Sequence, residues 1–352
     1  MISGKKTAAH ALNRPTSTAI LAGDQDYRPL LGRGRGLISK VLITGGNGFI
    51  GSHLAEKLTG QGDTVSLFDQ RFNSNSEGLS CERIRGDVRD YPSVGQAVDG
   101  KDAVFHFAAV SRVAWGEENP FNCWLTNQLG TVNVLEACRK SLTHPMLFYA
   151  SSREVYGEPS VLPVREDHPK NPKSVYGVTK LCAENACRSY LATANGFGAV
   201  NQIIFRFSNV YGSERDLPER VIPKFMAQAI RGEDIMLYGG EQVLDFTFID
   251  DTVSGILKAY SAGIHGDVSG EDFHFVTGTG CSVSELARMI VDLVGSSSRI
   301  IPVQGNGFEV RKFIGDPGKA NRMLGYEPRV RLQDGLRILK ERMVPAIAAK
   351  VT

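Results

Sequence analysis

The chain of 352 residues lacks the features that mark several classes of protein. Its 40 Lys and Arg and 38 Asp and Glu leave a formal net charge of +2, which gives no electrostatic reason to expect binding to nucleic acid or to a membrane surface. No apolar run approaches the roughly 18 residues that a membrane-spanning helix needs. Internal repeats and low-complexity segments are absent as well. We therefore predict a globular protein with neither a nucleic-acid nor a membrane partner.

Cysteine is scarce and shows no pattern. The six cysteines are scattered, with neither a CxxC pair nor the Cys/His spacing of a metal site, so we predict no bound metal. In a chain of this size they are expected to be reduced, mostly buried thiols of a cytoplasmic protein. Cys182 and Cys187 fall on a predicted helix, where packing is a better interpretation than redox chemistry.

Residues 1–36 show no apolar periodicity, and basic residues alternate there with Gly, Ser, Thr and Ala. We expect a flexible N-terminal tail. The tail has no continuous apolar h-region, which argues against a signal peptide. The stretch before Asp24 is basic and poor in acidic residues, so a role in organelle targeting stays open.

From Lys40 onward, short apolar segments alternate with segments of helical pattern. Residues 103–107, 146–150 and 202–207 are typical of strands, and helices are expected near 120–140 and 174–195. This alternation predicts an α/β fold with a doubly wound parallel sheet. We expect the sheet domain over 37–211, with a return segment near 245–262. A smaller C-terminal α/β lobe over 212–352 would bind the substrate.

A glycine-rich turn follows the first predicted strand, residues 40–44. Its spacing is GxxGxxG (Gly45, Gly48, Gly51), and an apolar helical face begins at Phe49. Strand, glycine turn and helix are the context of a dinucleotide fingerprint, with the pyrophosphate at the helix N-terminus. The residues expected to contact the cofactor at this turn are Gly45, Asn47, Gly48, Phe49, Ile50 and Gly51.

An acidic residue ends the second predicted strand, residues 64–69, about 20 residues past the turn. A carboxylate there accepts both ribose hydroxyls and repels a 2′-phosphate, so Asp69 favours NAD over NADP. Arg71 lies close enough to leave NADP open. Ligands of such sheets bind beyond the carboxyl ends of the strands, where Asp69 falls together with Gly45, Ala108 and Ser151.

Tyr176 and Lys180 lie one helical turn apart on the helix predicted to start near Ser174. A free phenol has a pKa near 10. We expect the Lys180 ammonium and a positively charged nicotinamide to lower the pKa of Tyr176 enough for it to act as a base. Ser152, at the end of a strand, is placed to donate a hydrogen bond to the same substrate oxygen. These residues predict proton transfer beside a dinucleotide.

With these motifs in order, the chain resembles the extended short-chain dehydrogenase/reductase family, and within it the NAD-dependent nucleotide-sugar epimerases and dehydratases. The likeness runs from about Ser39 to Leu339. The segments that carry it are Thr44–Gly51, Gly86–Val88, His106–Ala109, Asn127–Thr131, Ser151–Gly157, Tyr176–Lys180, Arg206–Gly212, Asp245–Asp251 and Asp316–Ala320.

The resemblance implies a Rossmann-type fold with NAD as cofactor, and a homodimer formed by the helices that carry Asn127 and Tyr176. Tyr176 would be the base, Lys180 would bind the nicotinamide ribose, and Ser152 would polarise the sugar hydroxyl. Further cofactor contacts are expected from Asp87, Val88, Ala108, Ala109 and Asn127. The residues expected to bind the nucleotide-sugar substrate are Ser111, Arg112, Arg153, Asn209, Arg220 and Val221.

Several positions depart from the family pattern. Glu154 occupies the place of an acid/base in dehydratases and decarboxylases, but Arg153 precedes it where one dehydratase group has an acid. Leu244 and Asn306 stand where arginines usually hold the substrate phosphates, and Arg215, Arg220, Lys224 or Arg311 could replace them. The substrate is then held differently, or it is not a standard nucleoside-diphosphate sugar.

We predict NAD-dependent epimerisation of a nucleotide sugar, with C4 as the inverted carbon and a transient 4-keto intermediate. One alternative is a nucleotide-sugar 4,6-dehydratase or decarboxylase that uses Glu154 as acid or base. Another is a non-catalytic NAD(H)-binding regulatory protein, because fold alone does not determine function.

Overall fold

The computed structural model describes residues 39–192, 199–264, 268–304 and 310–348. The predicted N-terminal tail, residues 1–36, lies outside the described residues. So does Asn306, where the second phosphate arginine of the family would be.

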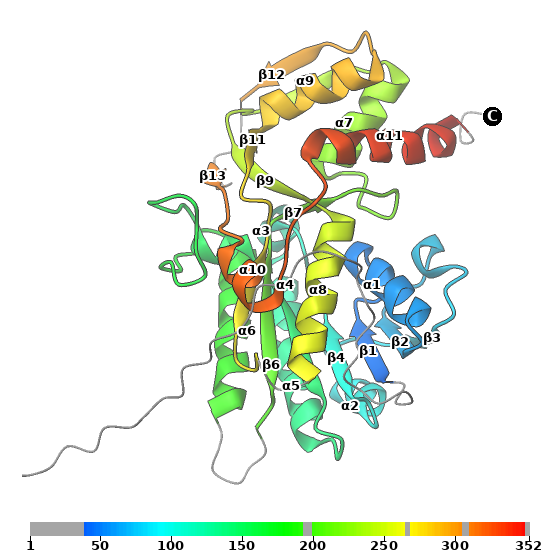
Figure 1. Ribbon diagram of the computed structural model, residues 1–352, viewed down its shortest axis with the longest axis vertical. Coiled ribbons are helices and arrows are strands. Elements are labelled where there is room, and N and C mark those ends of the chain that lie inside the picture. Colours follow the sequence, from blue (N-terminus) through cyan, green and yellow to red (C-terminus); the bar gives the residue numbers. More distant parts are fainter. Residues whose placement is uncertain (1–38, 193–198, 265–267, 305–309, 349–352) are drawn as a thin grey trace, which may run out of the picture. The chain divides into compact units, whose positions relative to one another are not determined.

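A seven-stranded sheet with all strands parallel forms the centre of the fold (Figure 1). Neighbouring strands pair in parallel throughout, which confirms the predicted doubly wound α/β fold. From one edge to the other the strands are β10 (Asp272–Phe275), β6 (Gln202–Phe207), β5 (Met146–Ser152), β4 (Ala103–His106), β1 (Lys40–Thr44), β2 (Thr64–Asp69) and β3 (Glu82–Arg85).

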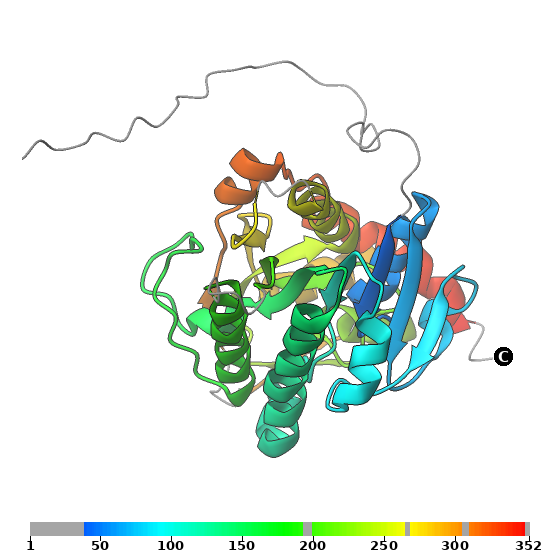
Figure 2. The ribbon, with the colours of Figure 1, turned by 90° about the horizontal axis from the view of Figure 1, so that it is seen from below.

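Helices cover both faces of this sheet (Figure 2). One face packs against α2 (Tyr91–Val98), α5 (Gly130–Lys140) and α6 (Val175–Ala192), and the other against α1 (Phe49–Gly60) and α8 (Ile249–Ile264). Strand β1 shows why its sequence is continuously apolar: Val41 and Ile43 belong to one buried cluster, and Leu42 belongs to the other. A strand buried on both faces needs apolar side chains at every position.

Before α5 the chain forms three short helical segments. These are α3 (Val113–Glu118), α4 (Pro120–Trp124) and a π-helical turn, η2 (Leu125–Leu129). Two 3-10 turns lie in loops near the carboxyl edge of the sheet, η1 (Ser74–Ser76) and η3 (Arg153–Tyr156).

Smaller sheets and three helices make up the remaining part of the fold. In one sheet β9 (Val243–Phe248) pairs with β7 (Asn209–Tyr211), β11 (Gly280–Ser282) and β13 (Lys312–Phe313), and in another β8 (Ile235–Tyr238) pairs with β12 (Ile300–Val303). The helices around them are α7 (Val221–Arg231), α9 (Val283–Val294) and α11 (Leu332–Ala348). The expected smaller α/β part is therefore present.

The two parts of the fold are not divided at the residue numbers predicted from the sequence. Helix α8 packs on the central sheet, as a return segment near 245–262 implies, but β9 pairs only with the smaller strands. Strand β10 and α10 (Gly318–Leu324) fall within the range assigned to the substrate lobe. Nevertheless β10 is an edge strand of the central sheet, and α10 packs on it.

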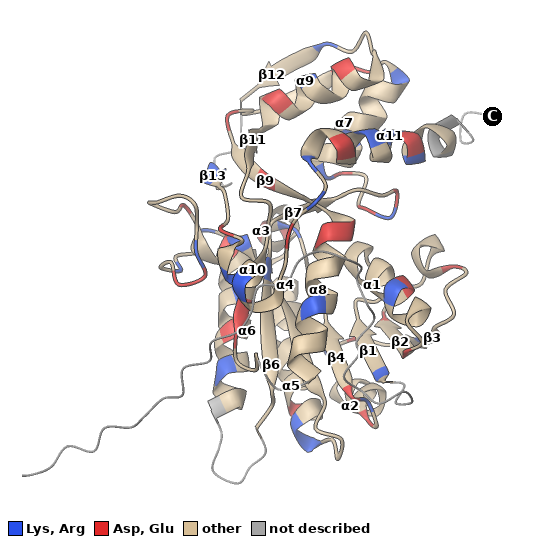
Figure 3. Cartoon of the chain, in the orientation of Figure 1, with Lys and Arg blue, Asp and Glu red and all other residues tan. Residues whose placement is uncertain are grey.

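Charged residues of both signs are interspersed on the outer helices, while the central strands carry few (Figure 3). None of the helices in the described ranges is long and apolar enough to cross a membrane. All six cysteines are free; three are buried and three are partly exposed, so fewer are buried than expected.

Candidate active site

A cavity of about 1140 Å³ lies between the carboxyl ends of the central strands and the smaller part of the fold. Loops that follow β1, β2, β4 and β5 line one side, and α7, β8 and β9 line the other. This is the edge at which ligands of doubly wound sheets bind. The site residues predicted from the sequence line this cavity, except Asp87, Asn127 and Arg311, one of the four candidates for binding phosphate.

The glycine turn forms a cradle that only glycine permits. Gly45 has a φ of +66°, and a Cβ there would lie 2.6 Å from the Ala108 nitrogen. A Cβ on Gly51 would lie 2.5 Å from the carbonyl oxygen of Gly45. Helix α1 begins immediately after Gly48, so its unpaired N–H groups are at the cavity. A pyrophosphate fits this arrangement of close backbone and helix N-terminus.

Asp69 is positioned beside this turn by backbone donors. Its carboxylate accepts hydrogen bonds from the Asn47 nitrogen at 3.1 Å and the Arg71 nitrogen at 3.3 Å. Burial raises the pKa of Asp69, although these backbone donors oppose the rise. The carboxylate retains acceptor capacity at the cavity, as recognition of ribose hydroxyls requires.

The loop after β2 contributes residues that the sequence analysis missed. Asn73 and Asn75 line the cavity. The Asn75 side-chain amide donates to the carbonyl of Asn47 at 3.1 Å and to the carbonyl of Arg215 at 3.2 Å. The Asn47 amide donates to Asn73 Oδ1 at 2.9 Å. These asparagines lie in a loop without periodicity, so the sequence offered no signal for them.

Two predicted cofactor residues are held away from the cavity. The Asp87 carboxylate is engaged by the Arg89 guanidinium, whose pairing lowers the pKa of Asp87. Asn127 is buried in the π-helical turn, where Oδ1 accepts from the Val110 nitrogen at 2.8 Å and Nδ2 donates to Thr179 Oγ1 at 3.0 Å. Its amide thus fixes the loop after β4 to helix α6 instead of facing the cavity.

Ser152, Tyr176 and Lys180 come together at the cavity as predicted. The Ser152 hydroxyl caps η3 by accepting from the Glu154 nitrogen at 3.2 Å, and it also hydrogen-bonds to the Tyr176 phenol. Lys180 Nζ donates to the Ala150 carbonyl at 2.7 Å and lies 5.0 Å from the centre of the Tyr149 ring. Burial lowers the pKa of Lys180 to about 8.

The predicted lowering of the Tyr176 pKa depends on a bound nicotinamide as well as on Lys180, and the protein groups by themselves do not produce it. Burial raises the pKa of Tyr176 to about 12, and the hydrogen bond from Ser152 only partly offsets this. Lys180 Nζ is bonded to the Ala150 carbonyl. At neutral pH the phenolate is therefore strongly disfavoured until a further positive charge enters the site.

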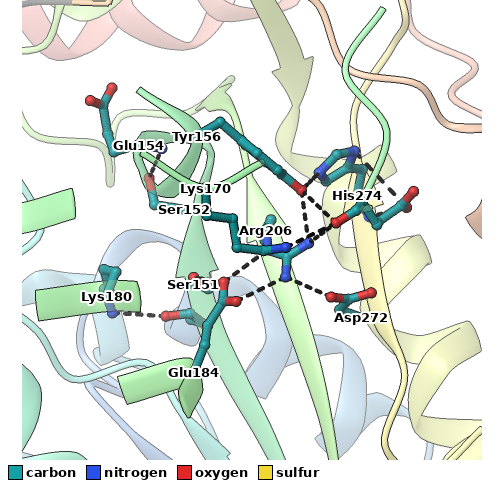
Figure 4. A network of polar contacts seen from close by, with 12 residues as sticks. Ser151, Ser152, Glu154, Tyr156, Lys170, Lys180, Glu184, Arg206, Asp272 and His274 are labelled. Atoms are coloured by element: carbon teal, nitrogen blue, oxygen red, sulfur yellow. Dashed lines mark hydrogen bonds and ion pairs between the residues drawn. The ribbon is translucent and has the colours of Figure 1, made fainter. Parts of the chain in front are cut away.

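Glu154 and Arg153 form an ion pair of 2.9 Å with little exposed side chain, 9% and 12%. The Arg153 guanidinium also lies 5.8 Å from the centre of the Phe313 ring. Figure 4 shows the Glu154 side chain turned away from the cluster around Arg206.

A buried ionic cluster lies behind the catalytic residues and was not predicted (Figure 4). Arg206 on β6 binds Glu184 on α6 and Asp272 on β10, and its Nη1 donates to the Tyr156 phenol at 2.7 Å. Ser151 Oγ donates to Glu184 at 2.6 Å. The cluster therefore joins the helix that carries Tyr176 and Lys180 to three strands of the sheet. The sequence signal that could have revealed this cluster was Arg206, a charged residue within the mostly apolar strand segment 202–207.

The substrate end of the cavity combines cations with apolar groups. Arg112 pairs with Glu219 at 3.9 Å across the cavity, and Arg220 pairs with the buried Asp216 at 3.1 Å. Leu244 lines the cavity and is 8% exposed. An apolar side chain therefore occupies the position at which the family resemblance implies an arginine that holds the substrate phosphate.

Comparisons with known proteins agree with this geometry. Residues 41–273 match the model of the NAD dependent epimerase/dehydratase family. A putative UDP-glucose 4-epimerase of Methanocaldococcus jannaschii is 33% identical over 304 residues, which cover 84% of this chain and 96% of the relative. UDP-glucuronic acid decarboxylase 1 of Xenopus tropicalis is 30% identical over 84% of this chain and 70% of its own.

A solved structure is similar throughout the fold. The UDP-glucuronic acid 4-epimerase of Bacillus cereus, in complex with UDP-glucuronic acid and NAD, gives a TM-score of 0.80 at 28% identity. The match covers 87% of this chain and 99% of that one.

Proposed function

Because this chain belongs to the NAD-dependent epimerase/dehydratase family, we propose that it inverts C4 of the sugar in a nucleotide sugar, through a transient 4-keto intermediate. The observation that carries this proposal is the convergence of Ser152, Tyr176 and Lys180 with the glycine cradle on one cavity. Residues 41–273, which match the family, include all of these groups.

The cofactor is NAD, and the residues present fit it. The glycine turn would hold its pyrophosphate and Asp69 its adenosine ribose, while Lys180 lies where the nicotinamide ribose is expected. Bound there, NAD supplies a hydride acceptor and a positively charged ring beside the phenol. The roles of Val88, Ala108 and Ala109 as further contacts are supported by their place in the cavity lining.

The protein's own groups provide the proton transfer. Tyr176 would take the proton of the sugar O4-hydroxyl while Ser152 donates a hydrogen bond to the same oxygen, which is general acid–base catalysis. Since burial is the main cause that raises the pKa of Tyr176 to about 12, removal of this proton would be coupled to the charge that enters with the oxidised cofactor. The buried cluster around Arg206 keeps α6 in place during this step.

Incubation with NAD and candidate UDP- or dTDP-sugars in heavy water tests this proposal. Epimerisation at C4 leaves the carbon skeleton free of solvent deuterium, whereas dehydration or decarboxylation places deuterium on a sugar carbon. A Tyr176→Phe variant that still binds NAD should lose the reaction. If the variant inverts C4 at the wild-type rate, Tyr176 is not the base.

A dehydratase or decarboxylase reaction is the second candidate, because the carboxyl group of Glu154 lies at the cavity. Its ion pair with Arg153 at 2.9 Å favours epimerisation, since a proton donor must first release that cation. The regulatory alternative predicts instead that neither wild type nor Tyr176→Phe alters any sugar nucleotide while both bind NAD.

The chain is further proposed to form a homodimer through α4, η2 and α5 together with α6. Large apolar side chains are exposed on α4 and η2: Phe121 is 73%, Trp124 39% and Leu129 42% exposed. Exposed apolar patches of this kind mark interaction surfaces. A Phe121→Asp variant should elute as a monomer in light-scattering chromatography. Location in the cytoplasm stays a prediction from the unpaired cysteines.

A further inference from the structure

The substrate end of the cavity contains a cation that no described carboxylate neutralises. Lys224 lies on α7, one turn after the residue that caps this helix, and lines the cavity. Its side chain is partly buried. Within the described ranges it forms no ion pair.

Four arginines that line the cavity are in a different situation, because each of them already has an acidic partner. The pairs are Arg112–Glu219 at 3.9 Å, Arg153–Glu154 at 2.9 Å, Arg215–Glu56 at 2.9 Å and Arg220–Asp216 at 3.1 Å. Among the described residues at this end of the cavity, Lys224 is therefore the cation whose charge is available to a ligand.

An exposed aromatic surface lies next to this lysine. Along β8, Ile235 and Leu237 are buried, whereas Met236 and Tyr238 are 36% and 51% exposed and line the cavity. Lys224 Nζ is 5.8 Å from the centre of the Tyr238 ring. A nucleotide base can stack on an aromatic ring and a thioether that face the cavity. A cation beside them can bind the phosphate of the same nucleotide.

Strand β9 contributes no charge to this end of the cavity. Its lining residues there are Leu244 and Phe246, both buried and apolar. An anion bound in this space is therefore held from the side of α7, where the first N–H groups of an 11-residue helix have no acceptor within the helix. These N–H groups would bind the anion together with Lys224.

We propose that Lys224 binds the diphosphate of a nucleoside-diphosphate substrate, whose base lies on Met236 and Tyr238. This inference rests on the proposed function and names the residue that replaces the arginine expected at position 244. The sugar then extends from the diphosphate toward Tyr176. Because an ammonium is a point charge on a flexible stem, the bond is less directional and more sensitive to salt than a bidentate arginine contact.

Calorimetric titration of the NAD-loaded protein with UDP and dTDP tests the role of Lys224. A Lys224→Met variant keeps the apolar stem and should lose roughly ten- to a hundredfold in affinity for the tighter of the two, with a weaker dependence on salt. Its affinity for the corresponding nucleoside, uridine or thymidine, should stay the same. Lys224→Arg should retain most of the affinity for the diphosphate.

Lys258→Met is the matched control. Lys258 is also a partly buried helical lysine, on α8, but it does not line the cavity, so this variant should bind both diphosphates like wild type. The inference is overturned if Lys224→Met binds UDP and dTDP as tightly as wild type, or if Arg112→Met loses this affinity instead. It is also overturned if wild type binds neither diphosphate.

These outcomes can be separated from the proposed function. Loss of diphosphate binding in Lys224→Met supports the site even if no sugar nucleotide is epimerised. Conversely, epimerisation that depends on Tyr176 but not on Lys224 retains the proposed function and removes the site. In a turnover assay with an accepted sugar nucleotide, Lys224→Met should raise KM far more than it lowers kcat.

Discussion

Arg206 and Glu184 form a two-point ion pair in which neither side chain has any exposed surface. Nε and Nη2 of the guanidinium donate to the two carboxylate oxygens, each at 2.8 Å. Glu184 lies one helical turn beyond Lys180 on α6, and Arg206 lies on β6. The pair therefore fixes the orientation of α6 against the sheet.

Replacement of Glu184 by Gln should destabilise the protein strongly, because it leaves the buried guanidinium of Arg206 without its main partner. Removal of one partner of a buried pair costs about 3 kcal/mol or more. Urea unfolding measures the loss. As the control, Asp167→Asn breaks an exposed pair with Arg165 and should change stability by less than about 1 kcal/mol. Equal effects of the two substitutions would contradict this role of the buried pair.

A Gly51→Ala substitution should abolish or greatly weaken NAD binding. The added Cβ would lie 2.5 Å from the Gly45 carbonyl oxygen, so the turn must open. Fluorescence titration with NADH measures the effect. Gly95→Ala on α2 is the matched change, because its Cβ meets no atom within 4 Å. That variant should bind NADH normally and gain up to about 1 kcal/mol in stability. If Gly51→Ala binds NADH as tightly as wild type, the glycine turn does not hold the dinucleotide.

Asp69→Asn should shift the cofactor preference from NAD toward NADP. The two carboxylate oxygens each accept from one backbone nitrogen. An amide oxygen can keep one of these bonds, and the loss of the negative charge removes the repulsion of a 2′-phosphate. We expect the ratio of the NADP to the NAD dissociation constant to fall by about tenfold or more. Asp63→Asn, a change outside the cavity lining, should leave the ratio as it is. An unchanged ratio in Asp69→Asn would exclude Asp69 from ribose recognition.

Stability should fall as the pH is lowered below 6.5, in part because of His274. Burial lowers the pKa of this histidine to about 3, so it stays neutral in the folded protein while the unfolded chain takes up a proton near pH 6.5. The unfolded state then binds more protons, and the contribution of this group at pH 5 is a loss of about 2 kcal/mol relative to pH 8.

His274→Gln isolates that contribution. The variant should be less stable at every pH, since it perturbs the 2.7 Å hydrogen bond between His274 Nε2 and the Tyr156 phenol. Between pH 8 and pH 5, however, it should lose about 2 kcal/mol less than wild type in urea unfolding. Parallel pH curves for the two proteins would show that the histidine is protonated in the folded state.

Local patterns were sufficient to predict much of this structure. The strand at 40–44, the glycine turn and the pairing of Tyr176 with Lys180 depend on neighbouring residues, because a buried parallel strand and a helical turn each impose a short period. The same patterns placed Ser152 and Asp69 at strand ends, and these side chains reach a common cavity because carboxyl ends of parallel strands meet at one edge.

Features that depend on residues distant in the sequence could not be predicted in this way. Strand β10 has four residues, and its place beside β6 depends on a crossover that no local signal marks. The raised pKa of Tyr176 in the chain without cofactor could not be predicted either, because the burial of the phenol and the bond of Lys180 to Ala150 are properties of the folded interior. A spacing of four residues brings two side chains to one helical face, but it does not determine which partner each one chooses.

One asparagine amide connects the glycine turn at Asn47 with the loop at Arg215, 168 residues further along the chain. Asn75 donates at the same time to the backbone beneath the dinucleotide cradle and to the backbone of the loop that precedes α7. If the two loops separate, the amide must give up one of these carbonyls. A widening of the entrance on the side of α7 therefore costs one of these two bonds, and the Asn75 amide links the position of the loop before α7 to that of the glycine turn.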